Sequence, residues 1–339
     1  SNLRLKQPFV EKKRSILEID ENTRRNLEIN NSLTGDKKSS LLSILNKTCT
    51  NFGYRLLQHR LNAPLTDFKL INRRLLITKF FYENPTLSIQ LKEILKLCPD
   101  FERALSRLAF YKNSFQDLIT LKEGIKTSLR IKKFFNEKSI NLTYPIKLIE
   151  ILNSFSDFKK IDNILDKALS EKNYQIGDQL SQINYGYSAE LDQLRDILLK
   201  SEKYISDLES SLIKETKISS LKIKKNNVLG YFIEVTSRNA DNILKDKNSH
   251  LFYHRQTTAN TYRFTNNELI SIENKINTAS IKISELEYKI YDDLKKLFLD
   301  FEYEIRLSAD SIGELDFYLS LGFVSREENW VKPIITKSN

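Results

Sequence analysis

The sequence predicts a mainly α fold, in which a helical core carries two long antiparallel helices with a small β-rich module at their tip. Residues that break helices are scarce, since the 339 residues include 8 glycines and 6 prolines, and no proline lies between Pro145 and Pro333. The hydrophobic pattern also changes period twice, from helical to alternating near residue 221 and back to helical near residue 265. Both observations favour long helices interrupted by one short strand-rich segment.

Residues 1–187 are predicted to form the helical core, as a series of short amphipathic helices. The first runs from Ser40 to Leu61 and ends before Pro64, because a proline disfavours helical geometry in the residue before it. The other helical patterns cover about residues 67–82, 87–97, 101–111, 115–136, 145–154 and 160–172. Their apolar faces predict packing against one another and indicate no site.

The first long helix is predicted over residues 188–213, where leucine and isoleucine recur on one face. The strand-rich module follows over residues 214–264, with strands expected at 221–224, 231–236 and 261–264. Asn226, Asn227 and Gly230 predict a hairpin turn between the first two strands. A looser stretch is expected over residues 237–258.

The second long helix is predicted over residues 265–308, and residues 309–339 are expected to return to the core. The start of this second long helix matches a capping box, in which Thr265 and Glu268 satisfy two free amide groups. An apolar seam then runs from Leu269 to Ile305 at spacings of three and four residues. A helix of this length cannot be buried alone, so we expect it to pair with the first long helix.

The chemistry-bearing residues exclude several classes of function. No glycine-rich phosphate loop of the GxGxxG or GxxxxGK[ST] type occurs. Two cysteines, Cys49 and Cys98, are too few for a disulfide framework or a multi-thiolate zinc site, and three histidines cannot form a dedicated metal cage without carboxylates. The sequence contains no run of 18 apolar residues, so it predicts no membrane-spanning helix. We therefore expect no catalytic residue, metal or cofactor in this segment, and no enzyme activity.

The net charge of +10 is concentrated in the strand-rich module. Residues 214–263 contain ten basic and four acidic side chains, 10 − 4 = +6, whereas a compositional bias toward lysine would spread the excess evenly. Such a patch is typical of a surface that binds a polyanion. The segment from Arg255 to Asn260 adds hydroxyl and amide side chains that suit phosphate oxygens. A solvated module with ordinary surface lysines is the alternative.

Specific motifs resemble the MutS family of DNA mismatch-recognition proteins. The run LKIKKNNVLGYFIEVT at residues 221–236, with HRQT at 254–257 and RFT at 263–265, is similar to the clamp region of that family. Similar segments follow the family order over nearly the whole chain: DENTRRNLE at 20–28, SLLSILNKTCTNFGYRLL at 40–57, APL at 63–65, DFERALSRL at 100–108, ELD at 314–316 and WVKP at 330–333.

This resemblance implies a core, lever and clamp segment without the family's mismatch-reading, connector and ATPase domains. Residues 1–187 would be the core, 188–213 and 265–308 the levers, 214–264 the clamp, and 309–339 the return to the core and a linker to the ATPase. In the family, the levers join the ATPase to the clamps, which close around duplex DNA by backbone contacts. For the longer parent the resemblance implies ATP and Mg, a homodimer, downstream mismatch-repair partners, and a bacterial cytoplasmic, nucleoid-associated location away from membranes.

The expected function is non-specific binding of the double-stranded DNA backbone by the clamp, with lever-mediated coupling to the ATPase. The resemblance implies DNA contacts by four side chains: Arg255, Thr257, Asn260 and Arg263. Charge alone adds three lysines: Lys222, Lys224 and Lys225. The alternative is a long-helix protein–protein scaffold with an incidental basic tip, and charge reversal at Arg255 and Arg263 would separate the two.

Overall fold

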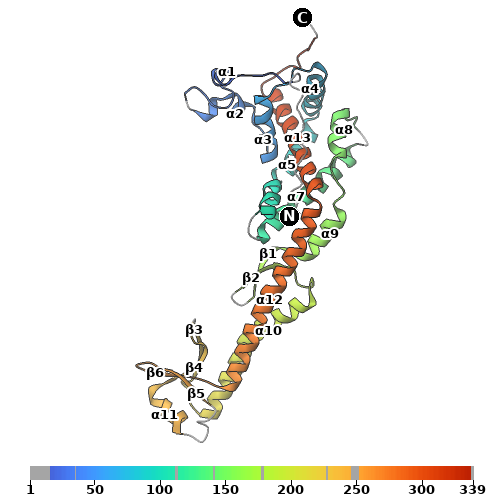
Figure 1. Ribbon diagram of the computed structural model, residues 1–339. Coiled ribbons are helices and arrows are strands. Elements are labelled where there is room, and N and C mark those ends of the chain that lie inside the picture. The colour runs from blue at the N-terminus through green and yellow to red at the C-terminus, as the bar shows by residue number, and fades with distance from the viewer. Residues whose placement is uncertain are drawn as a thin grey trace. The chain divides into compact units, whose positions relative to one another are not determined.

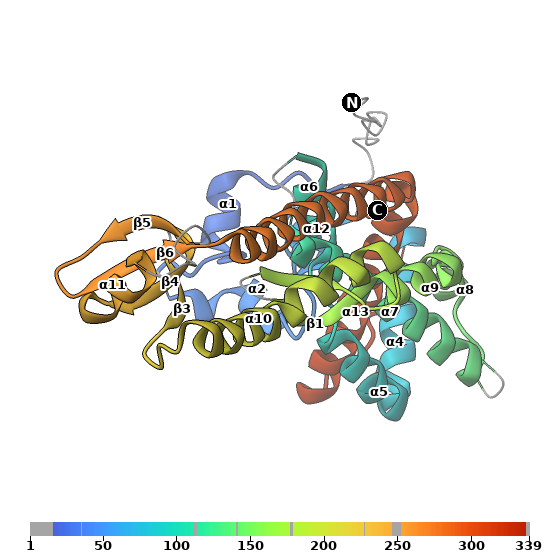
Figure 2. The same cartoon turned by 90° about the horizontal axis from the view of Figure 1, so that it is seen from below.

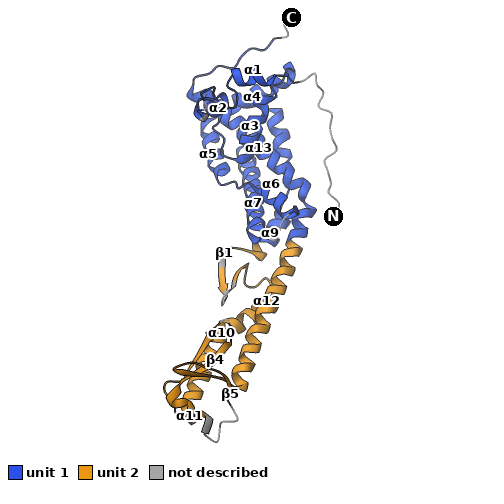
Figure 3. Cartoon of the chain, turned by 60° about the vertical axis from the view of Figure 1, so that its left-hand side comes forward, with its two compact units in different colours: residues 1–165, 295–339 blue, residues 166–294 orange. Residues whose placement is uncertain are grey.

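The computed structural model describes residues 16–34, 36–110, 114–139, 142–176, 179–226, 228–245 and 252–336. The chain divides into two compact units, residues 1–165 with 295–339 and residues 166–294 (Figure 3). Each unit has its own elements and is described by itself. No helix in the described ranges is long and apolar enough to cross a membrane.

The first unit is a bundle of helices around one buried helix, α13 (Glu302–Glu327) (Figure 1). Most residues of α13 between Ser308 and Val324 are buried, as expected for a helix surrounded by protein. Gly313 and Gly322 allow Phe52 and Phe81 of neighbouring helices to approach closely. The surrounding elements are α1 (Glu21–Asn26), a 3₁₀ turn (Lys37–Ser39), α2 (Leu41–Leu45), α3 (Asn51–Asn62), α4 (Phe68–Glu83), α5 (Pro85–Lys96), α6 (Phe101–Phe110), α7 (Phe115–Lys138), α8 (Ile146–Asn153) and α9 (Lys159–Ala168).

Side-chain caps explain where several of these helices begin. The side chains of Asp20, Ser40, Thr50 and Asp67 each accept a hydrogen bond from an amide in the first turn that follows. Helix α5 begins instead with Pro85, whose missing amide proton is no loss in a first turn. Local sequence therefore accounts for the starts of α1, α2, α3, α4 and α5.

The second unit is built on two long helices, α10 (Ala189–Thr216) and α12 (Asn267–Asp300), which run antiparallel and side by side (Figures 1 and 3). Between them in sequence lies a four-stranded antiparallel sheet with strand order β3-β4-β6-β5. Its members are β3 (Lys222–Asn226), β4 (Gly230–Thr236), β5 (Tyr253–Thr257) and β6 (Thr261–Thr265), and α11 (Ser237–Lys245) packs on β4 and β6 (Figure 2).

One face of this sheet closes a small hydrophobic core. Ile233, Val235 and Phe264 of the sheet pack with Leu212 near the end of α10 and Leu269 at the start of α12. Helix α11 contributes two further apolar side chains to the same cluster. The sheet is therefore attached where the two long helices end and begin, and the mainly α class with a small β-rich module is confirmed.

Two regions differ from the sequence-based expectation. A hairpin of β1 (Leu169–Ile176) and β2 (Gln179–Ile183) follows α9, where the sequence predicted helix to about residue 172 and no strand. The expected loose stretch contains α11 and β5. Asn227, expected in the β3–β4 turn, lies outside the described residues. Short strands gain their stability from partners elsewhere in the chain, so a local pattern identifies them poorly.

The second long helix is shorter than expected. It ends at Asp300, and Phe301 adopts a non-helical conformation before α13 begins. The apolar spacing continues through this break, since Phe298 and Ile305 are both buried. The two compact units divide the chain at residues 165/166 and 294/295.

The cap of α12 also differs by one residue. The Oδ1 atom of Asn266 accepts a 2.8 Å hydrogen bond from the amide of Leu269. The hydroxyl of Thr265, the expected cap, is buried and has no hydrogen-bond partner within the described part of the chain. The capping-box prediction was wrong because Thr265 still belongs to strand β6.

Candidate functional site

The sheet presents a polar face opposite its hydrophobic core. Cross-strand pairing places Lys222 opposite Glu234, Glu234 opposite Arg263, and Arg263 opposite Gln256. Directly opposed residues share one face of a sheet, and successive residues alternate between faces. Because the intervening residues Ile233 and Phe264 point into the core, this row lies on the other side. We call Lys222, Lys224, Glu234, Gln256 and Arg263 the polar face.

Glu234 occupies the centre of the polar face and binds two of its cations. The Nζ atom of Lys224 donates to Oε1 of Glu234 at 2.6 Å, and Nε of Arg263 donates to Oε2 at 3.3 Å. The hydrogen bond from Lys224, ahead of the charge of Lys224 and the contacts of Arg263, lowers the pKa of Glu234. Glu234 therefore stays ionised and neutralises part of the positive charge around it.

Arg263 is held almost entirely by protein groups. Its NH1 atom donates to Oε1 of Gln256 at 2.7 Å, and its guanidinium lies 4.6 Å from the ring centroid of Phe232. Only 23% of its side chain is exposed. With Glu234 as a third partner, Arg263 has little capacity left for a ligand in this conformation.

Arg255 projects from an irregularity in the edge strand. The pairing of β5 with β6 shifts between His254 and Gln256, which leaves Arg255 without an opposed residue. Such a bulge reorients a side chain relative to its strand. Arg255 is exposed and has no ion-pair partner among the described residues. It is available to an external anion.

The other predicted residues of this strand pair lie toward the β5–β6 turn. The hydroxyl of Thr257 lies 2.9 Å from Nε2 of His254, and both side chains are exposed. Asn260 lies in the turn, which Thr258 closes by hydrogen bonds to Thr261. The backbone carbonyl of Asn260 accepts from Ser237, so its exposed side-chain amide remains outside this contact.

The three predicted lysines of β3 have different surroundings. Lys222 is exposed and has no ion-pair partner in the ranges that the structure describes. Lys224 is half exposed and bound to Glu234. Lys225 lies on the opposite face of the strand, with Nζ 5.5 Å from the ring centroid of Tyr231. The seven predicted residues therefore form no single cluster. Lys222 and Arg255 are the two predicted cations that are exposed and have neither an ion pair nor a ring contact among the described residues.

Sequence reasoning missed Glu234 and Gln256 as members of the site. Both lie inside the motifs that carried the family resemblance, but neither is basic, and the charge count treated Glu234 only as a subtraction. The alternation of Lys222 and Lys224 in β3, and of Phe232 and Glu234 in β4, could have indicated a shared face. The register that brings these strands together could not be read from either strand alone.

Two glutamates fasten the sheet to the long helices. Oε2 of Glu209 in α10 accepts from the amide of Ile223 at 2.6 Å, which satisfies an edge amide of β3. Oε1 of Glu273 in α12 accepts from the amide of Tyr231 at 3.2 Å. Gly230 beside it has φ +68°, and a side chain there would overlap the Glu273 carboxylate. The sheet that carries the polar face is thus bound by one carboxylate from each long helix.

A buried arginine joins the same two helices farther along. Arg195 of α10 is fully buried and lies within 3.3 Å of Oε1 of Glu287 in α12. It also donates to the backbone carbonyl of Ile183 in β2 at 3.1 Å and lies over the ring of Tyr185. The guanidinium of Arg195 therefore connects the β1–β2 hairpin to both long helices. Because this charge is buried, it needs its partners to compensate for the water that it loses.

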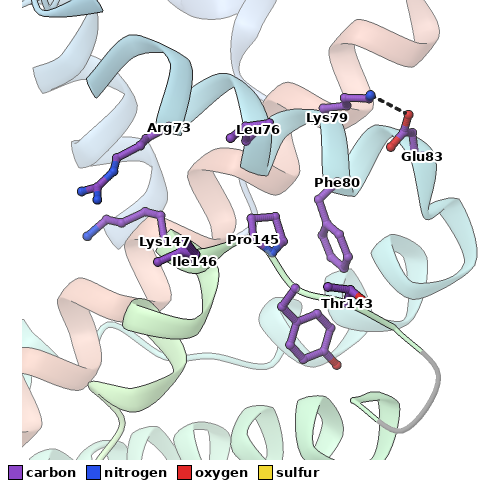
Figure 4. A pocket seen from close by; sticks show the side chains of 10 residues that line it. Arg73, Leu76, Lys79, Phe80, Glu83, Thr143, Pro145, Ile146 and Lys147 are labelled. Carbon is purple, nitrogen blue, oxygen red and sulfur yellow. Dashed lines mark ion pairs between the residues drawn. The ribbon is translucent and has the colours of Figure 1, made fainter. Parts of the chain in front are cut away.

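The first unit contains a groove between α4 and the start of α8, with a volume of about 580 Å³ (Figure 4). Its walls are mostly apolar, and the only ion pair drawn joins Lys79 to Glu83. The lining residues are Arg73, Leu76, Lys79, Phe80, Glu83, Thr143, Tyr144, Pro145, Ile146 and Lys147. No nucleophile–base pair lines it. Within the described ranges, no three His, Cys, Asp or Glu side chains gather as metal ligands.

Comparison with known proteins gives a consistent result. A family model described as MutS domain III matches residues 22–322. The chain is 35% identical over 322 residues to the DNA mismatch repair protein MutS of Rickettsia typhi. This match covers 95% of this chain and 36% of that protein. The MutS protein of Ruegeria pomeroyi is 34% identical over 334 residues, covering 98% and 38%. The chain thus spans little more than a third of the length of these curated relatives.

Proposed function

The chain belongs to the MutS family, and we propose that its four-stranded sheet binds the backbone of double-stranded DNA without sequence preference. The sheet would do so as the clamp of a protein that acts in DNA mismatch recognition. The observation that carries the proposal is the pair of exposed cations, Lys222 on β3 and Arg255 on the β5 bulge. Both are attached to a sheet that two helices hold in place.

The chemistry of these groups favours phosphate rather than base recognition. Lysine and arginine bind phosphate oxygens, and the exposed hydroxyl of Thr257 and amide of Asn260 can donate to the same oxygens. Such contacts position a protein on a duplex but do not distinguish base pairs. A few contacts of this kind give weak, salt-dependent binding.

We further propose that α10 and α12 transmit motion between the sheet and an ATPase domain of the longer protein. Glu209 and Glu273 support this role, because each fixes the sheet backbone to one of the helices. ATP and Mg would act in that domain, outside this chain. A homodimer would pair two clamps around the duplex, and downstream mismatch-repair proteins in a bacterial cytoplasm would respond to the closed state.

Salt-dependent DNA binding tests the first proposal. Fluorescence anisotropy of a labelled duplex, titrated with the chain at several salt concentrations, should give a falling affinity with a slope of about −0.9 per phosphate neutralised. Arg255→Ala should reduce that slope by about 1 and weaken binding equally for unrelated duplex sequences. Lys69→Ala, at an exposed lysine of α4 in the other unit, is the matched control and should change nothing. A slope near zero for the unaltered chain would contradict the proposal.

Charge reversal separates DNA binding from a scaffold role. Arg255→Glu should abolish binding while the chain remains folded, whereas a scaffold with an incidental basic tip would show no effect. Arg263 is unsuitable for this test, because a glutamate there would face Glu234 and disrupt the sheet.

A further inference from the structure

The polar face carries an anion of its own at the place where its cations converge. Glu234 is paired with Lys224 at 2.6 Å and with Arg263 at 3.3 Å, and it lies directly opposite Lys222. It is the only acidic side chain in the row of opposed residues that crosses the sheet. An isolated carboxylate between basic groups on a DNA-binding face requires an explanation, because it repels phosphate.

Glu234 cannot easily leave this position. It belongs to β4, which is paired on both sides by β3 and β6, and its side chain is only 14% exposed. Both of its oxygens are engaged, Oε1 by Lys224 and Oε2 by Arg263. A carboxylate and a phosphate accept the same charge-assisted hydrogen bonds from lysine and arginine. The donors that hold Glu234 are therefore those that a DNA phosphate would use.

We propose that Glu234 is an internal competitor for DNA phosphate, which occupies a phosphate site formed by Lys224 and Arg263 and thereby limits the affinity of the sheet for duplex DNA. The inference rests on the DNA binding proposed above. A phosphate that approaches Lys224 must displace its bond to Glu234 and lie beside the remaining carboxylate. Lys222 and Arg255 have no such competitor among the described residues, so they supply most of the attraction.

The consequence is a surface that binds the backbone loosely. Each contact with Lys224 exchanges one ion pair for another, so the net gain is small. A face with Lys222, Lys224 and Arg263 but no carboxylate would hold the duplex more tightly and release it more slowly. Glu234 therefore favours a sheet that can engage and leave DNA readily.

Glu234→Gln tests the inference most directly. Glutamine keeps the size and one acceptor oxygen but removes the charge. The variant should bind duplex DNA about twofold to fivefold more tightly, and its salt slope should become steeper by about 0.9. Glu202→Gln, at an exposed carboxylate of α10, makes the same change in net charge and should leave the affinity unaltered. Unchanged or weaker binding by a folded Glu234→Gln variant would overturn the inference.

A pair of lysine variants decides the question even if Glu234→Gln does not fold. Lys222→Gln should weaken binding and reduce the salt slope by about 0.9, whereas Lys224→Gln should change both much less, because Glu234 already offsets Lys224. Both lysines are exposed on one strand, so neither change removes a core contact. Equal losses of DNA affinity from the two variants would show that Glu234 does not neutralise Lys224.

The two proposals fail in distinguishable ways. If the unaltered chain shows no salt-dependent binding, the DNA-binding function itself is wrong. If the unaltered chain binds and Arg255→Ala weakens it, while Glu234→Gln gains nothing and the two lysine variants lose equally, only the competitor role of Glu234 is wrong.

Discussion

Asp316 illustrates how a single buried side chain connects distant parts of the helical unit. Its carboxylate is fully buried in α13 and accepts hydrogen bonds from the amides of Cys49 and Thr50 and from the Thr50 hydroxyl, at 2.7–3.0 Å. Gly53 allows this approach, since a side chain there would overlap the carboxylate. Burial raises the pKa of Asp316, while the hydrogen bonds from Thr50 and Cys49 act in the opposite direction.

Asp316→Ala should therefore be strongly destabilising. The change leaves the donors of Cys49 and Thr50 unpaired in the protein interior, and we expect the free energy of unfolding to fall by about 3 kcal/mol or more. Urea unfolding followed by circular dichroism measures the loss. Asp207→Ala, at an exposed position of α10, should remain within about 0.5 kcal/mol of the unaltered chain. A similar small effect at Asp316 would show that the three hydrogen bonds are not important for stability.

Glu234 should make stability depend on pH in a defined direction. Its pKa is lowered in the folded state, so its ion pairs contribute stability above the ordinary value of 4.5, and this contribution is lost as pH falls through the lower folded pKa. The difference in unfolding free energy between the unaltered chain and Glu234→Gln should therefore be constant near neutral pH and decrease below about pH 4.5. Chemical unfolding of both proteins between pH 3 and 7 measures it, and a difference that grows on acidification would refute the assignment.

At the scale of elements, the start of α12 shows how the sheet and the long helix share one junction. Thr265 ends β6, Asn266 caps the helix, and Leu269 at the first turn enters the core of the sheet. The strand and helix therefore follow each other without a flexible linker. A movement of α12 must act directly on β6, whose partner β4 carries Glu234.

The two residues of this junction should respond oppositely to substitution. Asn266→Ala removes the cap and should cost about 1 kcal/mol of stability. Thr265→Val removes a buried hydroxyl without a partner in the described part of the chain, so it should be neutral or slightly stabilising. Thermal unfolding of the two variants provides the comparison. If Thr265→Val is the more damaging change, the capping box centred on Thr265 is the better description.

Proline in the middle of α12 tests the proposed lever. Ile283 is buried in the interior of this helix, and Ile283→Pro should destabilise the helix by about 3 kcal/mol or more, since it removes a hydrogen bond and adds a clash. Ser284→Ala, at the next and exposed position, is the control. In the longer protein we expect the proline variant to bind ATP but to lose the response of DNA binding to ATP. Coupling that survives in this variant would place the relay elsewhere.

At the scale of the whole molecule, the chain consists of two units with different physical characters. Residues 1–165 and 295–339 surround one mostly buried helix, α13, whereas residues 166–294 have a smaller core and the cations proposed to meet DNA. The positive charge of the second unit is local: residues 214–263 carry 10 − 4 = +6, whereas residues 166–294 as a whole carry 18 − 19 = −1. A polyanion should therefore act first on residues 214–263 rather than on the second unit as a whole.

Hydrogen exchange with and without duplex DNA can test this division. Binding should slow exchange in β3 and in the β5–β6 strands and turn, because contact with phosphate restricts local opening there. Amides of α3 and α13 in the other unit should exchange at unchanged rates. Protection spread evenly over α3, α13 and the sheet would contradict a DNA site confined to residues 222–265.

Local properties of the sequence were sufficient to predict the helical class, the places of the long helices and the existence of the strand-rich module. Helical periodicity, caps and breakers act over a few residues, and family motifs such as LKIKKNNVLGYFIEVT are contiguous. The β1–β2 hairpin, β5 and the end of α12 at Asp300 escaped prediction because strand pairing and packing decide them, rather than the pattern of each segment alone. The sequence identified the basic residues of the strand-rich module. It did not show which of them remain free to bind an anion.

Only the tertiary structure decided which cations remain accessible. Lys224 and Arg263 are 10 and 29 residues from Glu234, and strand register alone brings their charged groups together. A charge count adds these side chains as independent terms, whereas pairing in the fold cancels some and leaves Lys222 and Arg255 exposed. Charge is a property of each residue, but its availability depends on contacts that form between strands distant in sequence.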